Sequence, residues 1–137
     1  MPTLILKTSV TLTDAAAADI AKALTRLTNE LLHKRPEVTA VVIEASPQLW
    51  TIGGVSSARP TAFLEISVTQ GTNTAEEKTA FIAATYAELG RRLAGRDDGL
   101  ALASYVIVRE LPADDWGYGG ETQAARARAR QAAAAAA

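Results

Sequence analysis

The start of the chain alternates between apolar and polar side chains. Residues 2–10 read Pro-Thr-Leu-Ile-Leu-Lys-Thr-Ser-Val, a run rich in residues that favour β structure. This pattern predicts a strand that begins at the second residue. A terminal residue that opens a strand is held by the sheet instead of fraying. We therefore expect the N-terminal end of the chain to be fixed in place.

Two longer segments show the spacing of apolar residues that is typical of helices. The first covers about residues 14–33, with Thr13 as its expected N-cap. The second runs to about residue 93 and starts with a capping box between Thr74 and Glu77. The apolar residues expected to face inward are Ile20, Leu24, Leu27 and Leu31 in the first helix and Phe81, Ile82, Leu89 and Leu93 in the second.

The two halves of the chain repeat each other. Residues 2–11 and 60–69 both read Pro-Thr, an apolar stretch and then Ser-Val-Thr. Each run is followed by one of the helical segments and then by a second strand, over 39–44 and 105–110. Two β-α-β units follow, with parallel strands within each unit. We expect an α+β fold in which a four-stranded mixed sheet carries both helices on one face.

The repeat also sets the expected domain organisation. Residues 1–123 form one domain, with units of about 2–58 and 59–120, and residues 124–137 are a low-complexity tail of Ala and Arg. A short isolated helix is marginal in water, so the tail is expected either to fray or to dock on a neighbouring subunit. Because no other segment covers the second, partly apolar face of the sheet, we expect a homo-oligomer packed around an axis.

Composition narrows the function classes. The 137-residue chain has 48% hydrophobic residues and a net charge of -1, which fits a single globular domain without a basic surface for nucleic acid. It has no cysteine and one histidine, so we expect no metal site and no cofactor. We find neither an apolar stretch long enough for a bilayer nor a signal peptide. A cytoplasmic protein without a membrane partner is expected.

The second residue, Pro2, is the strongest candidate for chemistry. Aminopeptidases remove an initiator Met that precedes a small residue, which would leave Pro2 with a free secondary amine. A terminal amine has a pKa near ~7.7–8.0, and apolar or cationic surroundings lower that value. Such an amine can act as a base or nucleophile at neutral pH. Met-Pro also starts many ordinary proteins, so the interpretation depends on the strand that follows.

A proline that opens a strand, a duplicated β-α-β unit and a chain of this length together resemble the tautomerase superfamily. The likeness covers residues 2–120 and is to the fused form of 4-oxalocrotonate tautomerase and to macrophage migration inhibitory factor. It implies a homotrimer with a barrel-like core and a catalytic Pro2. The matching Pro60 lies inside the chain, so its amide nitrogen cannot act as a base.

The resemblance also implies binding residues. The segment 34–38 is similar to the region after the first helix of macrophage migration inhibitory factor, which places Lys34 at the mouth of the site. The segment 110–120 is similar to the end of malonate semialdehyde decarboxylase, and it makes Trp116 and Tyr118 either a pocket wall or an interface anchor. Arg35 and Arg109 are further candidates for binding a carboxylate.

The function that these residues favour is keto-enol tautomerisation of a small 2-oxo or 2-hydroxydienoate acid. Decarboxylation or hydration of a three-carbon acid is the alternative, with Glu37 orienting water. The expected arginine pair of the decarboxylase is missing, because residues 70–74 read Gln-Gly-Thr-Asn-Thr. A trimeric binding protein without catalysis is a further alternative, since a fold does not fix a reaction.

Overall fold

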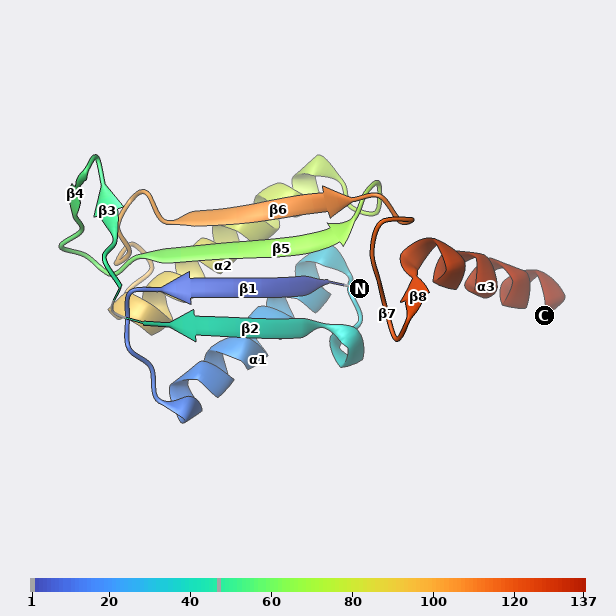
Figure 1. Ribbon diagram of the computed structural model, residues 1–137, viewed down its shortest axis with the longest axis horizontal. Helices are drawn as coiled ribbons and strands as arrows, with labels where there is room; N and C mark the ends of the chain where they lie inside the picture. The colour runs from blue at the N-terminus through green and yellow to red at the C-terminus, as the bar shows by residue number, and fades with distance from the viewer. Residues whose placement is uncertain (1, 47) are drawn as a thin grey trace.

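The computed structural model describes residues 2–46 and 48–137, and its centre is a four-stranded sheet (Figure 1). The strands are β1 (Thr3–Thr8), β2 (Ala40–Ala45), β5 (Ala62–Thr69) and β6 (Tyr105–Leu111), in the order β2-β1-β5-β6. The pairs β1–β2 and β5–β6 are parallel, whereas β1 and β5 are antiparallel. The predicted mixed sheet of two β-α-β units is confirmed.

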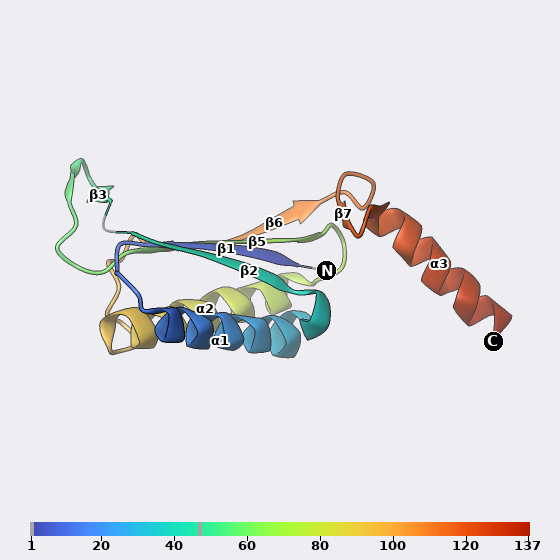
Figure 2. The same cartoon turned by 60° about the horizontal axis from the view of Figure 1, so that its bottom comes forward.

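Two long helices, α1 (Asp14–Leu32) and α2 (Ala75–Ala94), lie side by side on one face of the sheet (Figure 2). Their starts are those predicted: the Thr13 side chain accepts from the Ala16 N–H at 3.1 Å, and Thr74 and Glu77 form the capping box. The first helix ends one residue earlier than expected, because His33 adopts a left-handed conformation with φ of 58°.

The core lies between the helices and the sheet. Alternate residues of the central strands point into it, including Leu4 and Leu6 of β1, which are fully buried. Leu31 is only half-buried, whereas the next residue, Leu32, is buried. The prediction that Ile82 faces inward is wrong, since its exposed fraction is 39%. Phe81 takes the core position, and one helical step of about 100° carries Ile82 away from it.

No residue that the structure describes covers the opposite face of the sheet, which we call the open face (Figure 2). It carries Ile5, Val42 and Tyr105, which are 40%, 53% and 60% exposed. Two ion pairs cross this open face: Lys7 with Glu44 at 3.9 Å, and Arg109 with Glu65 at 2.5 Å. The face is therefore apolar at its centre, with paired charges between neighbouring strands.

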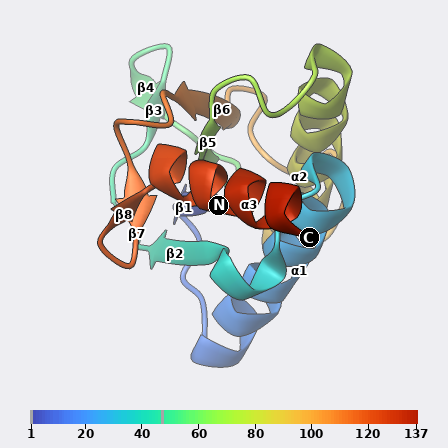
Figure 3. The same cartoon turned by 90° about the vertical axis from the view of Figure 1, so that its right-hand side faces the viewer.

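The remaining elements lie at the two ends of the sheet. The hairpin of β3 (Thr51–Ile52) and β4 (Val55–Ser56) is at one end. The short helix η1 (Pro36–Val38), the hairpin of β7 (Gly117–Tyr118) and β8 (Glu121–Thr122), and helix α3 (Gln123–Ala136) are at the other. Figure 3 looks onto this second end, where α3 extends from the β7–β8 hairpin toward the viewer. The expected low-complexity tail forms most of α3.

A buried carboxylate stabilises the outer side of the helix layer. The Glu88 side chain is 8% exposed and accepts from Arg92 Nε at 2.7 Å and from Arg91. Arg26 of α1 lies 3.9 Å away, so Glu88 also joins the two helices. The hydrogen bond from Arg92 is the main cause of a lowered Glu88 pKa, against the raising effect of burial.

We expect Glu88→Gln to lower the free energy of unfolding by about 1–3 kcal/mol at pH 7, because charge-assisted hydrogen bonds are lost inside the protein. A carboxylate with a lowered pKa contributes its stability above its unfolded pKa, about 4.3, and loses it as pH falls through the folded value. The difference between the two proteins should therefore shrink in acid. Urea unfolding at pH 7 and pH 3 measures both effects.

Glu30 provides the matched control for this experiment. It pairs with Arg26 at 3.3 Å but is 53% exposed. An exposed pair of this kind contributes about 0.5 kcal/mol or less, so Glu30→Gln should change little at either pH. Equal effects of the two substitutions would contradict the role assigned to Glu88.

Candidate active site

The N-terminal end of β1 and the C-terminal end of β5 lie side by side at one end of the sheet. Thr3 pairs with Ser67, and the Pro2 carbonyl accepts from the Ala40 N–H at 3.3 Å. Continuing the antiparallel register by one step brings Pro2 opposite Val68. Pro2 is buried.

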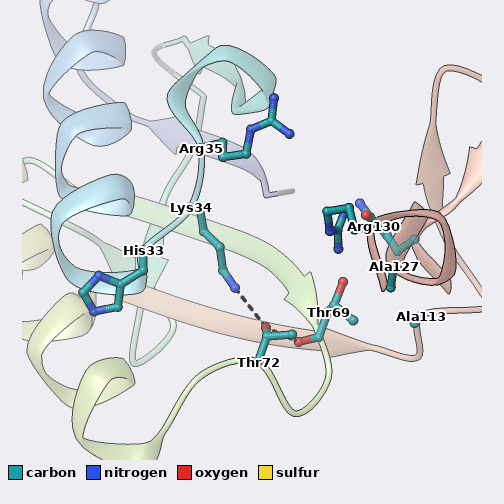
Figure 4. Close-up of a pocket in the computed structure, with 9 residues that line it drawn as sticks. His33, Lys34, Arg35, Thr69, Thr72, Ala113, Ala127 and Arg130 are labelled. Carbon is teal, nitrogen blue, oxygen red and sulfur yellow. Dashed lines mark hydrogen bonds between the residues drawn. The ribbon is translucent and has the colours of Figure 1, made fainter. Parts of the chain in front are cut away.

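A cavity of about 230 Å³ lies at this end of the sheet (Figure 4). Thr69 at the end of β5 contributes to it, so the cavity adjoins the strand end that faces Pro2. Lys34 and Arg35 come from the segment after α1, and Arg130 approaches from α3 on the other side. The residues that line the cavity are His33, Lys34, Arg35, Thr69, Thr72, Ala113, Gln123, Ala127 and Arg130.

Lys34 is the cation that the structure holds most firmly at the cavity. The Asn29 side chain donates to the Lys34 carbonyl at 2.9 Å, and Lys34 Nζ donates to Thr72 Oγ1 at 2.9 Å. The residue is 9% exposed. Burial lowers the pKa of Lys34, and the negative charges of Glu77 and Glu110 partly oppose this. The ammonium group is therefore positioned and partly desolvated, which strengthens its attraction for an anion.

Arg35 and Glu37 lie at the outer rim. Arg35 Nε donates to Glu37 Oε1 at 3.3 Å, and both residues are exposed. The pKa of Glu37 is lowered, first by its own backbone N–H and then by Arg35. Arg35 lines the cavity, whereas Glu37 does not. The carboxylate proposed to orient water thus lies outside the lining and pairs with a neighbouring cation.

Both aromatic candidates lie outside the lining of the cavity. Trp116 and Tyr118 are half-buried in the segment that forms β7, and neither lines the 230 Å³ space. The Arg126 guanidinium stacks on Tyr118, with 3.8 Å between its Cζ and the ring centroid. Tyr118 also contributes to an adjoining depression, together with Arg35, Arg126 and Arg130. Tyr118 is therefore a neighbour of the cavity, on the side of α3.

Arg109 lies apart from these residues. Its register partner is Ser67 on the open face, and its guanidinium binds Glu65 at 2.5 Å. It does not line the cavity of its own chain. The structure thus gathers Lys34 and Arg35 at the cavity. Pro2 lies at the adjoining strand end but does not line the cavity, and Arg109 lies on the sheet surface.

Sequence reasoning missed the contribution of α3. Gln123, Ala127 and Arg130 line the cavity, and they follow one another at helical spacings of four and three residues. That spacing was available in the sequence. It was hidden by the alternating arginines at 126, 128 and 130, which suggest a low-complexity tail instead of a helix face.

The structure also bears on metal ions and membranes. Within residues 2–46 and 48–137, no three side chains of the His, Cys, Asp and Glu types group as ligands for a metal ion. In the same part of the chain, no helix combines the length and apolar character needed to cross a bilayer.

Comparisons with known proteins show the fold. No family model and no curated protein sequence matches the chain. Its structure is similar to that of a macrophage migration inhibitory factor-like protein from Entamoeba histolytica, with a TM-score of 0.70, 20% identity, and coverage of 88% of this chain and 97% of that one. It is also similar to a fused 4-oxalocrotonate tautomerase solved as an asymmetric trimer, with a TM-score of 0.75, 22% identity, and coverage of 90% and 98%.

A third similar structure is that of a protein inactivated by 2-oxo-3-pentynoate, with a TM-score of 0.74, 15% identity, and coverage of 90% of this chain and 98% of that one. The chain therefore has the fold that the macrophage migration inhibitory factor-like protein and the fused 4-oxalocrotonate tautomerase share, with both β-α-β units in one polypeptide.

Proposed function

We propose that this protein is a cofactor-independent tautomerase that interconverts the keto and enol forms of a small 2-oxo or 2-hydroxydienoate acid. The observation that carries the proposal is the position of Pro2, at a strand end that adjoins a cavity lined by Lys34, Arg35 and Arg130. Among the residues that the structure describes, no Asp or Glu lines that cavity. Its charge suits an acid substrate, and removal of Met1 would supply a base beside it.

In the proposed mechanism the secondary amine of Pro2 is neutral. It takes a proton from one substrate atom and returns it to another, so no cofactor is needed. The Lys34 ammonium binds the substrate carboxylate and stabilises the negative charge that develops on the enolate oxygen. The same positive charge disfavours protonation of Pro2, which keeps the amine available as a base near neutral pH.

The other candidates have secondary roles in this proposal. Arg35 at the rim attracts the acid, and Tyr118 shields the neighbouring side of the site. Trp116 lines a separate depression, so we give it no role in the reaction. Arg109 lies on the open face, so it reaches a substrate only if a neighbouring subunit brings a second cavity to it. We do not extend the proposal to decarboxylation or hydration, because Glu37 is exposed and pairs with Arg35.

The first experiment is an intact mass measurement, followed by ultraviolet assays of phenylpyruvate and 2-hydroxymuconate ketonisation. We expect a mass that lacks Met1 and activity that rises through a pKa below that of an ordinary amine. 2-Oxo-3-pentynoate, which inactivates one of the similar proteins, should form one adduct, located by peptide mapping on Pro2. A retained Met1, or a processed chain inert toward both acids, would overturn the proposal.

We also propose a homotrimer in which the open sheet faces form the shared core. The exposed apolar residues Ile5 and Val42 support this, and two of the similar fused tautomerases were solved as trimers. Light scattering should give three times the mass of one chain. Val42→Asp places a charge in the predicted core and should produce monomers, because an unpaired buried charge is costly.

Ile82→Asp is the matched control for the trimer experiment. Ile82 is also exposed and apolar, but it belongs to α2 and lies on the other side of the molecule from the open face. This variant should remain a trimer. A monomeric wild-type protein, or a Val42→Asp protein that stays trimeric, would contradict the proposed assembly.

A further inference from the structure

The loop that joins β5 to α2, residues 70–74, connects the two β-α-β units at the candidate site. Thr72 Oγ1 accepts from Lys34 Nζ at 2.9 Å, a contact that Figure 4 marks with a dashed line. The next residue, Asn73, donates through its side chain to the Leu32 carbonyl at 3.0 Å. Lys34 and Leu32 belong to the first unit, whereas the loop belongs to the second. The position of the Lys34 ammonium therefore depends on both units.

The loop is itself held to the neighbouring strand β6. The Gln70 N–H donates to the Leu111 carbonyl at 2.9 Å, and the Gly71 N–H donates to Glu110 Oε2 at 3.0 Å. Gly71 has a φ of 80°, a left-handed conformation that glycine adopts without strain. The loop is therefore a tight turn with its own anchors on the second unit, which allows it to hold a side chain of the first unit in place.

Hydrogen bonding within the loop decides the role of the Thr72 hydroxyl. Thr72 Oγ1 donates its one proton to the Thr69 carbonyl at 2.6 Å. The lone pairs of the same oxygen are left to accept, and the Lys34 ammonium, which can only donate, is the partner that they meet. The hydroxyl is thus oriented as an acceptor toward Lys34 Nζ. An acceptor in this position stabilises the charged form of a lysine.

The Lys34 ammonium keeps donors for a ligand. It has three N–H groups, and one of them is directed at Thr72. In the part of the chain that the structure describes, no carboxylate oxygen lies within 4.0 Å of Lys34 Nζ. Glu77 of α2 and Glu110 of β6 act on its charge from a greater distance. The other basic side chains around the cavity are those of His33, Arg35 and Arg130.

We propose that Thr72 is a positioning residue, which orients the Lys34 ammonium toward the cavity and thereby sets the affinity of the site for a carboxylate. This rests on the proposed function for the assignment of the substrate carboxylate to Lys34. The loop has no cation of its own, since residues 70–74 read Gln-Gly-Thr-Asn-Thr. Its contribution to anion binding is therefore indirect, through the oxygen that holds the cation of the first unit.

A double-mutant cycle tests whether Thr72 acts through Lys34. Thr72→Val removes the acceptor at nearly constant side-chain size, and we expect it to lower both kcat/KM for phenylpyruvate and the calorimetric affinity for sorbate, an unreactive monocarboxylate, about 10-fold. Thr72→Ser keeps the hydroxyl and should recover most of this loss. In the Lys34→Met protein, Thr72→Val should change either quantity less than about twofold, because the interaction that it removes is already gone.

Titration of the Lys34 side chain gives a readout that does not depend on turnover. The Cε resonance of Lys34 is identified by its absence from the NMR spectrum of Lys34→Met, and its chemical shift is followed as the pH rises. Loss of an acceptor destabilises the ammonium, so the Lys34 pKa in Thr72→Val should lie below that of the wild-type protein. Thr72→Ser should keep the wild-type titration.

Thr79→Val is the matched control. The Thr79 hydroxyl also donates to a backbone carbonyl, that of Ala75 at 2.9 Å, but Thr79 is exposed on α2 and does not line the cavity. This variant should leave the kinetics, the sorbate affinity and the Lys34 titration unchanged.

The outcomes separate this inference from the proposed function. If the wild-type protein turns over neither acid but the sorbate cycle and the Lys34 titration behave as expected, the tautomerase proposal fails and the role of Thr72 stands. If the protein is an active tautomerase and the effects of Thr72→Val and Lys34→Met are additive, the role of Thr72 is overturned. Equal losses in Thr72→Ser and Thr72→Val would also overturn it, because the hydroxyl would then not be the cause.

Discussion

Replacing Pro2 with alanine is expected to lower kcat for ketonisation by at least about 100-fold, the contribution of a well-positioned general base. The initiator Met would also be removed from this variant, but its terminal amine is primary and is held less rigidly than the nitrogen of the proline ring. Folding should be unaffected, because the backbone bond from the Ala40 N–H to the carbonyl of the second residue is retained. Steady-state kinetics, thermal unfolding and intact mass are measured on one preparation.

The chain contains its own control for this experiment. Pro60 occupies the corresponding place in the second β-α-β unit, and its carbonyl accepts from the Ala101 N–H at 2.8 Å. Because its nitrogen is an internal amide, Pro60→Ala should keep kcat within about threefold. Unchanged turnover in the Pro2 variant would exclude the proposed base, and an equally large loss at Pro60 would indicate a structural effect common to both.

Lys34 carries the second large expected effect. Lys34→Met should lower kcat/KM about 10–100-fold, because a charge-assisted contact to the substrate carboxylate is lost. Lys22, a lysine of α1 that does not line the cavity, is the control, and Lys22→Met should leave the kinetics unchanged. Equal kinetics of the two variants would remove Lys34 from the mechanism.

The pH profile gives a sharper test of the same residue. Burial lowers the pKa of Lys34, so the ammonium is lost at a lower pH than for an ordinary lysine. The profile of kcat/KM should rise as Pro2 becomes neutral and fall as Lys34 loses its proton. In Lys34→Arg the guanidinium stays charged, so the alkaline fall should disappear and the acid side should remain. An unchanged alkaline side would assign it to another group.

Local patterns in the sequence were sufficient to predict the four strands of the main sheet and the two long helices. The alternation in residues 2–10 marked the strand with buried Leu4 and Leu6, and the residue types at Thr13 and Thr74 marked both helix starts. These signals act over a few residues, so they can be identified without knowledge of the rest of the chain. The repeat of Pro-Thr and Ser-Val-Thr then indicated two β-α-β units, each with two parallel strands.

Only part of the candidate site could be predicted from local patterns in the sequence. Pro2 followed from the start of the chain, and Lys34 and Arg35 followed from a resemblance in one loop. Thr72, which accepts from Lys34 Nζ, belongs to the other half of the chain. The contact of Arg109 with Glu65 depends on the register of β5 against β6, which places that pair on the open face instead of at the cavity.

The sequence by itself therefore determined the four strands of the main sheet, the starts of the two long helices and the duplicated units, and it predicted Pro2 as the candidate base. Only the tertiary structure decided that the β7–β8 hairpin fixes the start of α3, and that Arg130 and Lys34 thereby line one cavity. The physical reason is the range of the forces involved. Caps and periodicity are local, whereas the meeting of distant residues depends on strand register and on packing summed over the whole chain.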